Sequence, residues 1–265
     1  MECSTIHSLN AFANLVFLRI TDDDFYKSYE DPPFPDSLYT LPRLSLPRLE
    51  DMRIVCTAIN SDDIHPDGYL PFFVGAKAEL PALRRLHLYE ACISDYSDGI
   101  MGQFLEAHGR GLRELHLTTF FMEELDRIHE LAPNLTTLVC NHSPHEFADV
   151  YQGGLEHPLI EYLSFSGLCD FTETIQHIDP AKLPKLREVR YMDARWDIDY
   201  TSHRENHVNE AGKILEDIEM ALSLAEKGIP CSDANGKPFG GLLSMARQRR
   251  GKEDISNNDI AAIQG

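Results

Sequence analysis

Histidine and cysteine residues at recurring positions are the side chains here that could bind a metal ion. His87 and His116 occupy the same place in two similar segments, and Cys140 is followed by His142 and His145. Imidazole and thiolate groups are the ligands that zinc prefers. A structural zinc site needs about four converging ligands, however, and the spacing places Cys140 where a side chain faces the core. We therefore expect no metal site.

Sequence motifs of catalysis are absent. The chain has no phosphate-binding G-x-x-x-x-G-K-[ST], no G-x-G-x-x-G after an expected strand, no G-x-S-x-G and no H-E-x-x-H. Its acidic residues are spread over expected loops and helix faces, where solvation explains them. We expect a protein that is not an enzyme and uses no cofactor.

The elements that would position these side chains form a repeat. Leu83-x-x-Leu86-x-Leu88, within the segment from Leu80 to Asp95, has a spacing that returns along the chain, and leucine-proline or proline often precedes it. We expect such a proline to be tolerated because it enters the strand. From Leu83 onward the intervals fall in the period of roughly 20 to 29 residues of leucine-rich repeats, and two earlier intervals are longer. Seven repeats are expected, starting at Leu15, Leu49, Leu83, Leu112, Leu135, Ile160 and Leu186.

Helical spacing alternates with these strands. Ile100, Met101, Phe104 and Leu105 predict a helix that starts after Ser94 or Ser97 and ends near Gly109, and Leu125 to Ala132 predict another. Parallel strands joined by helices on one side must curve, because helices are wider than strands. The expected fold is α/β, a leucine-rich-repeat solenoid over residues 1–200. It is a curved horseshoe with parallel strands on the concave face and helices and loops on the convex face.

Both ends of this array carry expectations. Ser202 to Glu205 form a capping box, apolar residues follow at helical spacing, and Gly228 and Pro230 end the pattern. This predicts a C-terminal capping helix over 201–229, followed by a mobile tail over 230–265. No capping helix precedes the first repeat, so an upstream region or another chain is expected to cover that edge. The insertion at 22–45 is either a solvated loop or a target-binding loop.

Charge limits the class of partner. The 265 residues carry a formal net charge of -19, which disfavours nucleic acid and anionic membranes. No apolar run is long enough to cross a bilayer, and the first ten residues lack the order of a secretory signal. The six cysteines are scattered without a disulfide spacing. We expect a cytoplasmic or nuclear protein with a protein partner.

Four segments carry a family resemblance: LPALRRLHLYEACISD, LRELHL, APNLTTLVC and LPKLREVRY. They resemble the repeats of fungal-type F-box/leucine-rich-repeat proteins, and the resemblance covers roughly Leu9 to Lys227. It implies that the repeats hold a substrate for a ubiquitin ligase, whose adaptor would bind an N-terminal F-box module; no such module is visible in this sequence, so it would be a missing upstream part. A stand-alone scaffold or adaptor without a ligase link is the alternative.

The residues between the leucine positions should line the concave face. A carboxylate-bearing polypeptide with an aromatic or aliphatic anchor is expected to bind there, chiefly at Arg19, Arg53, Arg85 and Tyr89. Alternatively, Arg53 and Arg85 simply pair with Asp51 and Glu114. His87 and His116 would lie side by side, about 4.8 Å apart, as an inert or a pH-sensitive pair. The candidate partner-binding residues are Arg19, Arg53, Arg85, His87, Tyr89, His116, Asn141, Tyr162 and Arg190.

Overall fold

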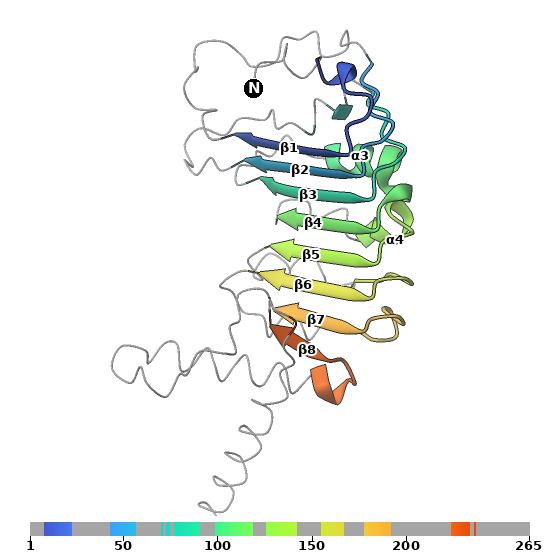
Figure 1. Ribbon diagram of the computed structural model, residues 1–265. Helices are drawn as coiled ribbons and strands as arrows, with labels where there is room; N and C mark the ends of the chain where they lie inside the picture. The colour runs from blue at the N-terminus through green and yellow to red at the C-terminus, as the bar shows by residue number, and fades with distance from the viewer. Residues whose placement is uncertain are drawn as a thin grey trace, which may run out of the picture.

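Eight parallel strands form one open sheet in the computed structural model, and they follow one another across the sheet in chain order (Figure 1). The structure describes residues 8–22, 43–56, 70, 73–74, 77–90, 99–118, 126–141, 155–166, 178–191, 224–233 and 236. The strands are β1 (Phe17–Asp22), β2 (Asp51–Cys56), β3 (Arg85–Glu90), β4 (Glu114–Thr118), β5 (Thr137–Asn141), β6 (Tyr162–Ser166), β7 (Glu188–Tyr191) and β8 (Cys231–Asp233).

The strand register confirms the predicted columns. Arg19, Arg53, His87, His116, Val139, Ser164 and Arg190 are paired in sequence from β1 to β7. We call the sheet face that carries this column the polar face. The alternate residues point to the opposite face, because side chains of a strand alternate. They form a continuous core, with members such as Leu18, Met52, Leu86, Leu115, Leu138, Leu163 and Val189.

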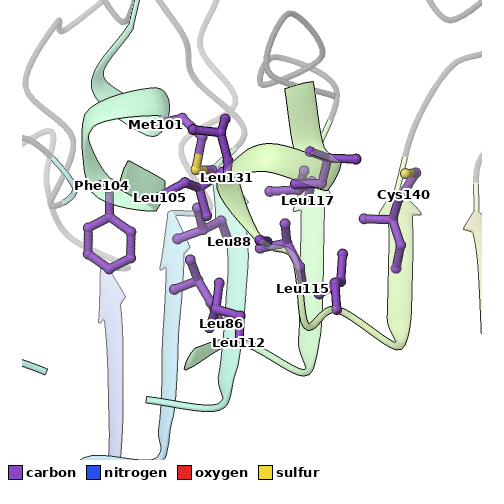
Figure 2. Packing of buried hydrophobic residues seen from close by; sticks show 14 of the residues in the cluster. Leu86, Leu88, Met101, Phe104, Leu105, Leu112, Leu115, Leu117, Leu131 and Cys140 are labelled. Atoms are coloured by element: carbon purple, nitrogen blue, oxygen red, sulfur yellow. The ribbon is translucent and has the colours of Figure 1, made fainter. Parts of the chain in front are cut away.

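The helices pack on the core side of the sheet. Four helical elements have defined bounds: η1 (Ser8–Ala11), α3 (Ile100–His108), η5 (Gly109–Gly111) and α4 (Ile128–Leu131). Met101, Phe104 and Leu105 of α3 and Leu131 of α4 belong to the same core as the strand leucines, and Figure 2 shows Leu105 next to Leu88. Helix α3 ends at His108, close to the predicted Gly109. Its N-cap is Gly99 (φ 77°) and forms no side-chain hydrogen bond, while Ser94 and Ser97 lie outside the described residues.

A tight turn precedes most of the strands in the same way. The N–H of the first leucine of the repeat donates to the carbonyl three residues earlier, as in Leu49 to Leu46, Leu83 to Leu80 and Leu186 to Leu183, at 3.0–3.1 Å. Pro47, Pro81 and Pro184 stand at the second position of these turns. Proline favours that position because its ring fixes φ near -65°. The prolines therefore shape the turn before the strand, and the prediction that they enter the strand is wrong.

The C-terminal end differs in part from expectation. Most of the predicted 201–229 helix lies outside the described residues, but residues 224–226 are helical. The chain then turns at Gly228 (φ 75°), where the Gly228 and Ile229 N–H groups donate to Ala225 and Leu224. These two hydrogen bonds form the usual glycine C-cap, as predicted. A mobile tail was expected from residue 230, yet Cys231–Asp233 pair with β7 as β8.

Residues 234–235 and 237–265 of the predicted tail and residues 23–42 of the insertion lie outside the description. Cys140 and Cys231 are buried and join the core. Burial raises the pKa of Cys140 to about 12. None of the helices in the described parts of the chain has the length and apolar character that spanning a membrane requires.

Candidate binding face

The polar face brings most of the predicted partner-binding residues together. Arg19, Arg53, Arg85, His87, His116, Tyr162 and Arg190 lie on it, in the register that their spacing predicts. Tyr89 and Asn141 belong to β3 and β5, but their side chains lie outside the described part of the structure. The sheet is thus the element that arranges the candidate site.

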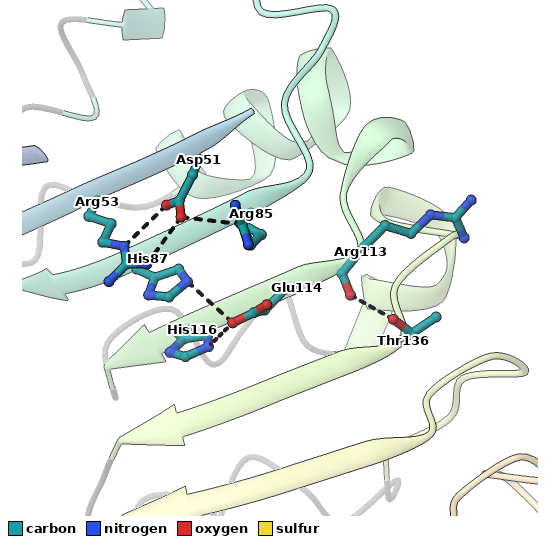
Figure 3. A network of polar contacts seen from close by, with 8 residues as sticks. All are labelled: Asp51, Arg53, Arg85, His87, Arg113, Glu114, His116 and Thr136. Atoms are coloured by element: carbon teal, nitrogen blue, oxygen red, sulfur yellow. Dashed lines mark hydrogen bonds and ion pairs between the residues drawn. The ribbon is translucent and has the colours of Figure 1, made fainter. Parts of the chain in front are cut away.

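Asp51 organises the first of three polar clusters on this face. Arg53 donates to both carboxylate oxygens of Asp51 from Nε and Nη2 at 3.1 Å, and Arg85 Nε lies 3.2 Å from Oδ2 (Figure 3). Asp51 is buried beneath the two arginines. The alternative that both arginines are paired is therefore confirmed for Asp51, whereas Glu114 contacts two histidines instead.

Glu114, His87 and His116 form the second cluster. The two imidazole rings stack with centroids 3.7 Å apart and an angle of 12° between their planes. Glu114 Oε1 lies 2.7 Å from His116 Nε2 and 3.4 Å from His87 Nε2. These two contacts hold the pKa of Glu114 far below its usual range. Burial lowers the pKa of His116, although its hydrogen bond with Glu114 acts in the opposite direction.

Glu188, Arg190 and Ser232 form the third cluster at the other end of the face. Arg190 Nη2 donates to Glu188 Oε2 at 2.9 Å, and the Ser232 hydroxyl donates to Glu188 Oε1. Burial acts to raise the pKa of Glu188, but these hydrogen bonds outweigh it and lower that pKa. The Arg190 guanidinium also lies over the Tyr162 ring, 5.4 Å from its centroid, as Arg53 lies over Phe17 at 5.3 Å.

A depression of about 310 Å³ opens where β3, β4 and β5 begin. Two arginines at its wall fasten neighbouring turns to one another, because Arg84 donates to the carbonyls of Leu83 and Gly111 and Arg113 donates to that of Asn134. These bonds give the two arginines a structural role. The lining residues are Glu50, Arg84, Arg85, Arg113, Glu114, Thr136 and Thr137.

Two carboxylates on this face have roles that the sequence argument did not assign. Asp51 holds two arginines rather than one, and Glu114 holds two histidines rather than Arg85. Each stands two residues before a cationic or imidazole residue on its own strand, as Glu188 stands before Arg190. That spacing puts both side chains on one face and is the signal that could have identified the pairs.

The arrangement provides hydrogen-bond donors and aromatic surface along a fixed sheet. This combination suits recognition of a carboxylate-bearing chain. Comparison of the whole chain with protein-family models, with curated proteins and with solved structures finds no match.

Proposed function

We propose that this chain is a leucine-rich-repeat solenoid that binds a polypeptide partner on its polar face, a binding role rather than a catalytic one. The repeated turn before the strands, the parallel strands in chain order and the buried leucine columns support this architecture. The proposal includes a C-terminal capping helix over 201–229, supported by its helical last turn and glycine cap.

The observation that carries the binding role is the layering of charge on the polar face. The Asp51 side chain is 5% exposed, whereas those of Arg53 and Arg85 are 40% and 48% exposed. The same order holds for Glu188 at 18% and Arg190 at 39%. The acids lie beneath the bases, so the partner meets guanidinium groups on a protein whose overall charge is strongly negative.

These arginines are also held in place before a partner arrives. Asp51 fixes Arg53 and Arg85, and the Phe17 ring supports Arg53 from one side. A side chain that is already ordered loses less conformational entropy on binding. Phe17 is itself 46% exposed and offers apolar area next to the cations. We therefore infer a partner segment with one or more carboxylates beside an aromatic or aliphatic residue.

The test is an affinity purification with three forms of the protein: wild type, a triple variant and a control variant. The partners that each form recovers are compared. Asp51→Asn, Arg53→Gln and Arg85→Gln are combined in one variant, so that no buried charge remains unpaired. Arg127→Gln with Glu130→Gln is the control, because this exposed ion pair lies at α4, on the other side of the sheet. We expect the triple variant to bind a specific partner at least about tenfold more weakly, which corresponds to about 1.4 kcal/mol of binding free energy. Equal recovery with all three forms would contradict the proposal.

A link to a ubiquitin ligase is the finer form of this proposal, based on the resemblance of the repeats to F-box proteins. If the link exists, the cullin-complex adaptor is recovered with wild type and with the triple variant alike, since the adaptor would bind outside the polar face. A stand-alone scaffold or adaptor is the second candidate, because its binding needs only the repeats. Recovery of a partner without any such adaptor favours the scaffold.

A further inference from the structure

Three potential metal ligands converge at the centre of the polar face. Ligand atoms of His87, Glu114 and His116 all lie within 4.8 Å of one another. Figure 3 shows both imidazole rings directed toward the same Glu114 carboxylate. The group therefore has the donor types and the closeness that a metal ion requires.

The backbone fixes this convergence. His87 in β3 and His116 in β4 are register partners, so the two rings lie on adjacent strands of one face. Glu114 precedes His116 by two residues and thus emerges on the same face. Ligands that come from rigid strands are held more precisely than ligands on loops.

The distances fit a small tetrahedral ion, but one imidazole ring must turn when the ion binds. The two rings stack with 12° between their planes, and an imidazole holds a metal ion in its own plane, so both nitrogens can face one ion only after that rotation. Zinc–nitrogen and zinc–oxygen bonds of roughly 2.0–2.1 Å place neighbouring ligand atoms about 3.3 Å apart. The separation of 3.4 Å between Glu114 Oε1 and His87 Nε2 already matches this value. The 2.7 Å contact between Glu114 and His116 Nε2 would widen by about 0.6 Å as the ion replaces the proton between them. A neutral imidazole can carry that proton on Nδ1 instead.

Burial and charge favour binding on balance. The side chains of His87, His116 and Glu114 are 7%, 16% and 31% exposed, so the site is shielded from water but open on one side. Two cations oppose binding, because Arg53 is the register partner of His87 and Arg85 is that of Glu114. Both contact Asp51, whose single negative charge offsets part of theirs. A bound dication also meets a protein with a net charge of -19.

We propose that His87, Glu114 and His116 form a binding site for a divalent transition-metal ion, best suited to zinc. Imidazole nitrogen is a good ligand for zinc, and two histidines with one glutamate form a known three-ligand set that leaves a further position for water. Cys140 is not part of it, because it is buried in the core on the opposite face. The expectation of no metal site considered Cys140 and overlooked Glu114.

The test is a titration of the metal-free whole chain with Zn²⁺, in which calorimetry measures the heat of binding. The chain has other histidines and cysteines, so the result is read as the difference between variants. Glu114→Gln keeps the size of the side chain and one acceptor oxygen but removes the negative charge, and His116→Ala removes one imidazole. His129→Ala is the matched control. His129 also lies near a carboxylate, 3.9 Å from Glu130, but among the described residues it belongs to no group of three potential metal ligands.

We expect wild type and His129→Ala to bind one equivalent of Zn²⁺ that both site variants lose or bind at least about tenfold more weakly. Circular dichroism establishes that each variant is folded, and a zinc-dependent rise in melting temperature gives a second measurement. If His116→Ala does not fold, the half-buried and isosteric Glu114→Gln decides the question. Superimposable titrations of wild type and Glu114→Gln would overturn the proposal, whatever the polypeptide binding shows.

Discussion

Asp51 explains how a cationic surface persists on a strongly acidic protein. Its carboxylate is buried and contacts Arg53 and Arg85, so the two arginines together exceed its single negative charge. Removal of one member of a buried ion pair leaves a charge without compensation and costs more than the pair itself stabilises. The acid is therefore a positioning residue for the arginines, and replacing it alone would confound stability with binding.

His157 is a buried histidine whose two ring nitrogens both have backbone partners. Nε2 lies 3.1 Å from the Ala132 carbonyl, and Nδ1 accepts from the Leu159 N–H at 3.1 Å. Nδ1 can accept only when it carries no proton, so the ring is neutral and holds its proton on Nε2. It joins the segment before β6 to the residue after α4. Burial accordingly lowers the pKa of His157, although the bond to Ala132 opposes the shift.

We predict that stability falls on acidification through His157. In the unfolded chain the ring takes up a proton near pH 6.5, whereas the folded chain does so only at lower pH. The stabilisation is thus complete above about pH 6.5 and is lost as the pH falls toward the folded pKa. His157→Leu should be about 2 kcal/mol less stable at pH 7.5, since two backbone groups lose partners. The difference from wild type should narrow at pH 5.5 in urea unfolding; a constant difference would contradict this role.

At the scale of elements, Gly109 sets how closely α3 approaches α4. It follows α3 with φ -63°, an ordinary helical value, so it is not there to form a left-handed cap. A Cβ atom at this position would lie 2.2 Å from the Leu131 carbonyl oxygen. The backbone of the two elements is therefore in contact at a place where only glycine fits.

We expect Gly109→Ala to lower the free energy of unfolding by about 1–3 kcal/mol, because backbone must move to relieve the clash. Gly99→Asn is the control: Gly99 has φ 77° and open space around it, and asparagine tolerates the left-handed region. Chemical denaturation of both variants checks the prediction. A smaller effect at Gly109 than at Gly99 would show that the contact is not tight.

The helical turn at residues 224–226 is a second element whose packing can be measured. Leu224 is fully buried in the core, and Lys227 donates to the Ile178 carbonyl at 2.9 Å. We expect Leu224→Ala to destabilise the protein by about 2–5 kcal/mol through the lost contacts and the cavity. Glu226→Ala, at an exposed position of the same turn, should stay within about 0.5 kcal/mol of wild type. Similar melting temperatures for the two variants would show that this turn does not cover the sheet.

The strands could be predicted from sequence because their signal repeats. A spacing of leucine and similar residues that occurs seven times fixes both the strand position and the residue that faces the core, as Leu86 and His87 illustrate. Strand β8 has only three residues and no such spacing, so it was missed. Its pairing with β7 depends on the glycine cap that returns the chain to the sheet, which is a tertiary effect.

The side-chain pairs of the candidate site could be predicted only to the level of a column. Asp51, Arg85 and Glu114 stand at one register position on three successive strands, so spacing alone gives Arg85 two equal acidic neighbours. The stacked histidines contact Glu114 and leave Arg85 to Asp51. That choice depends on ring packing and burial across strands, which no single segment encodes.

At the scale of the whole molecule, the first and last of the described strands do not pair with each other. Each strand pairs with its neighbours in sequence, and β1 and β8 are the two edges. Stability in such an arrangement is approximately a sum over units and their interfaces. A local defect should therefore lower the stability of the neighbouring strands first. Very strong interfaces would instead make the whole protein unfold as one unit.

Val189→Ala tests this local response because Val189 is fully buried in β7, next to the last strand. We expect amide hydrogen exchange to become faster in β6, β7 and β8, where the lost methyl groups weaken the packing. Protection of β2, β3 and β4 should stay within about threefold of wild type, since these strands share no pairing with β7. An equal acceleration in all strands would instead show one cooperative unit. In that case the strands that carry Asp51 and its arginines would unfold together with the strand that carries Arg190. A partner bound at one end of the polar face would then stabilise the other end of the sheet.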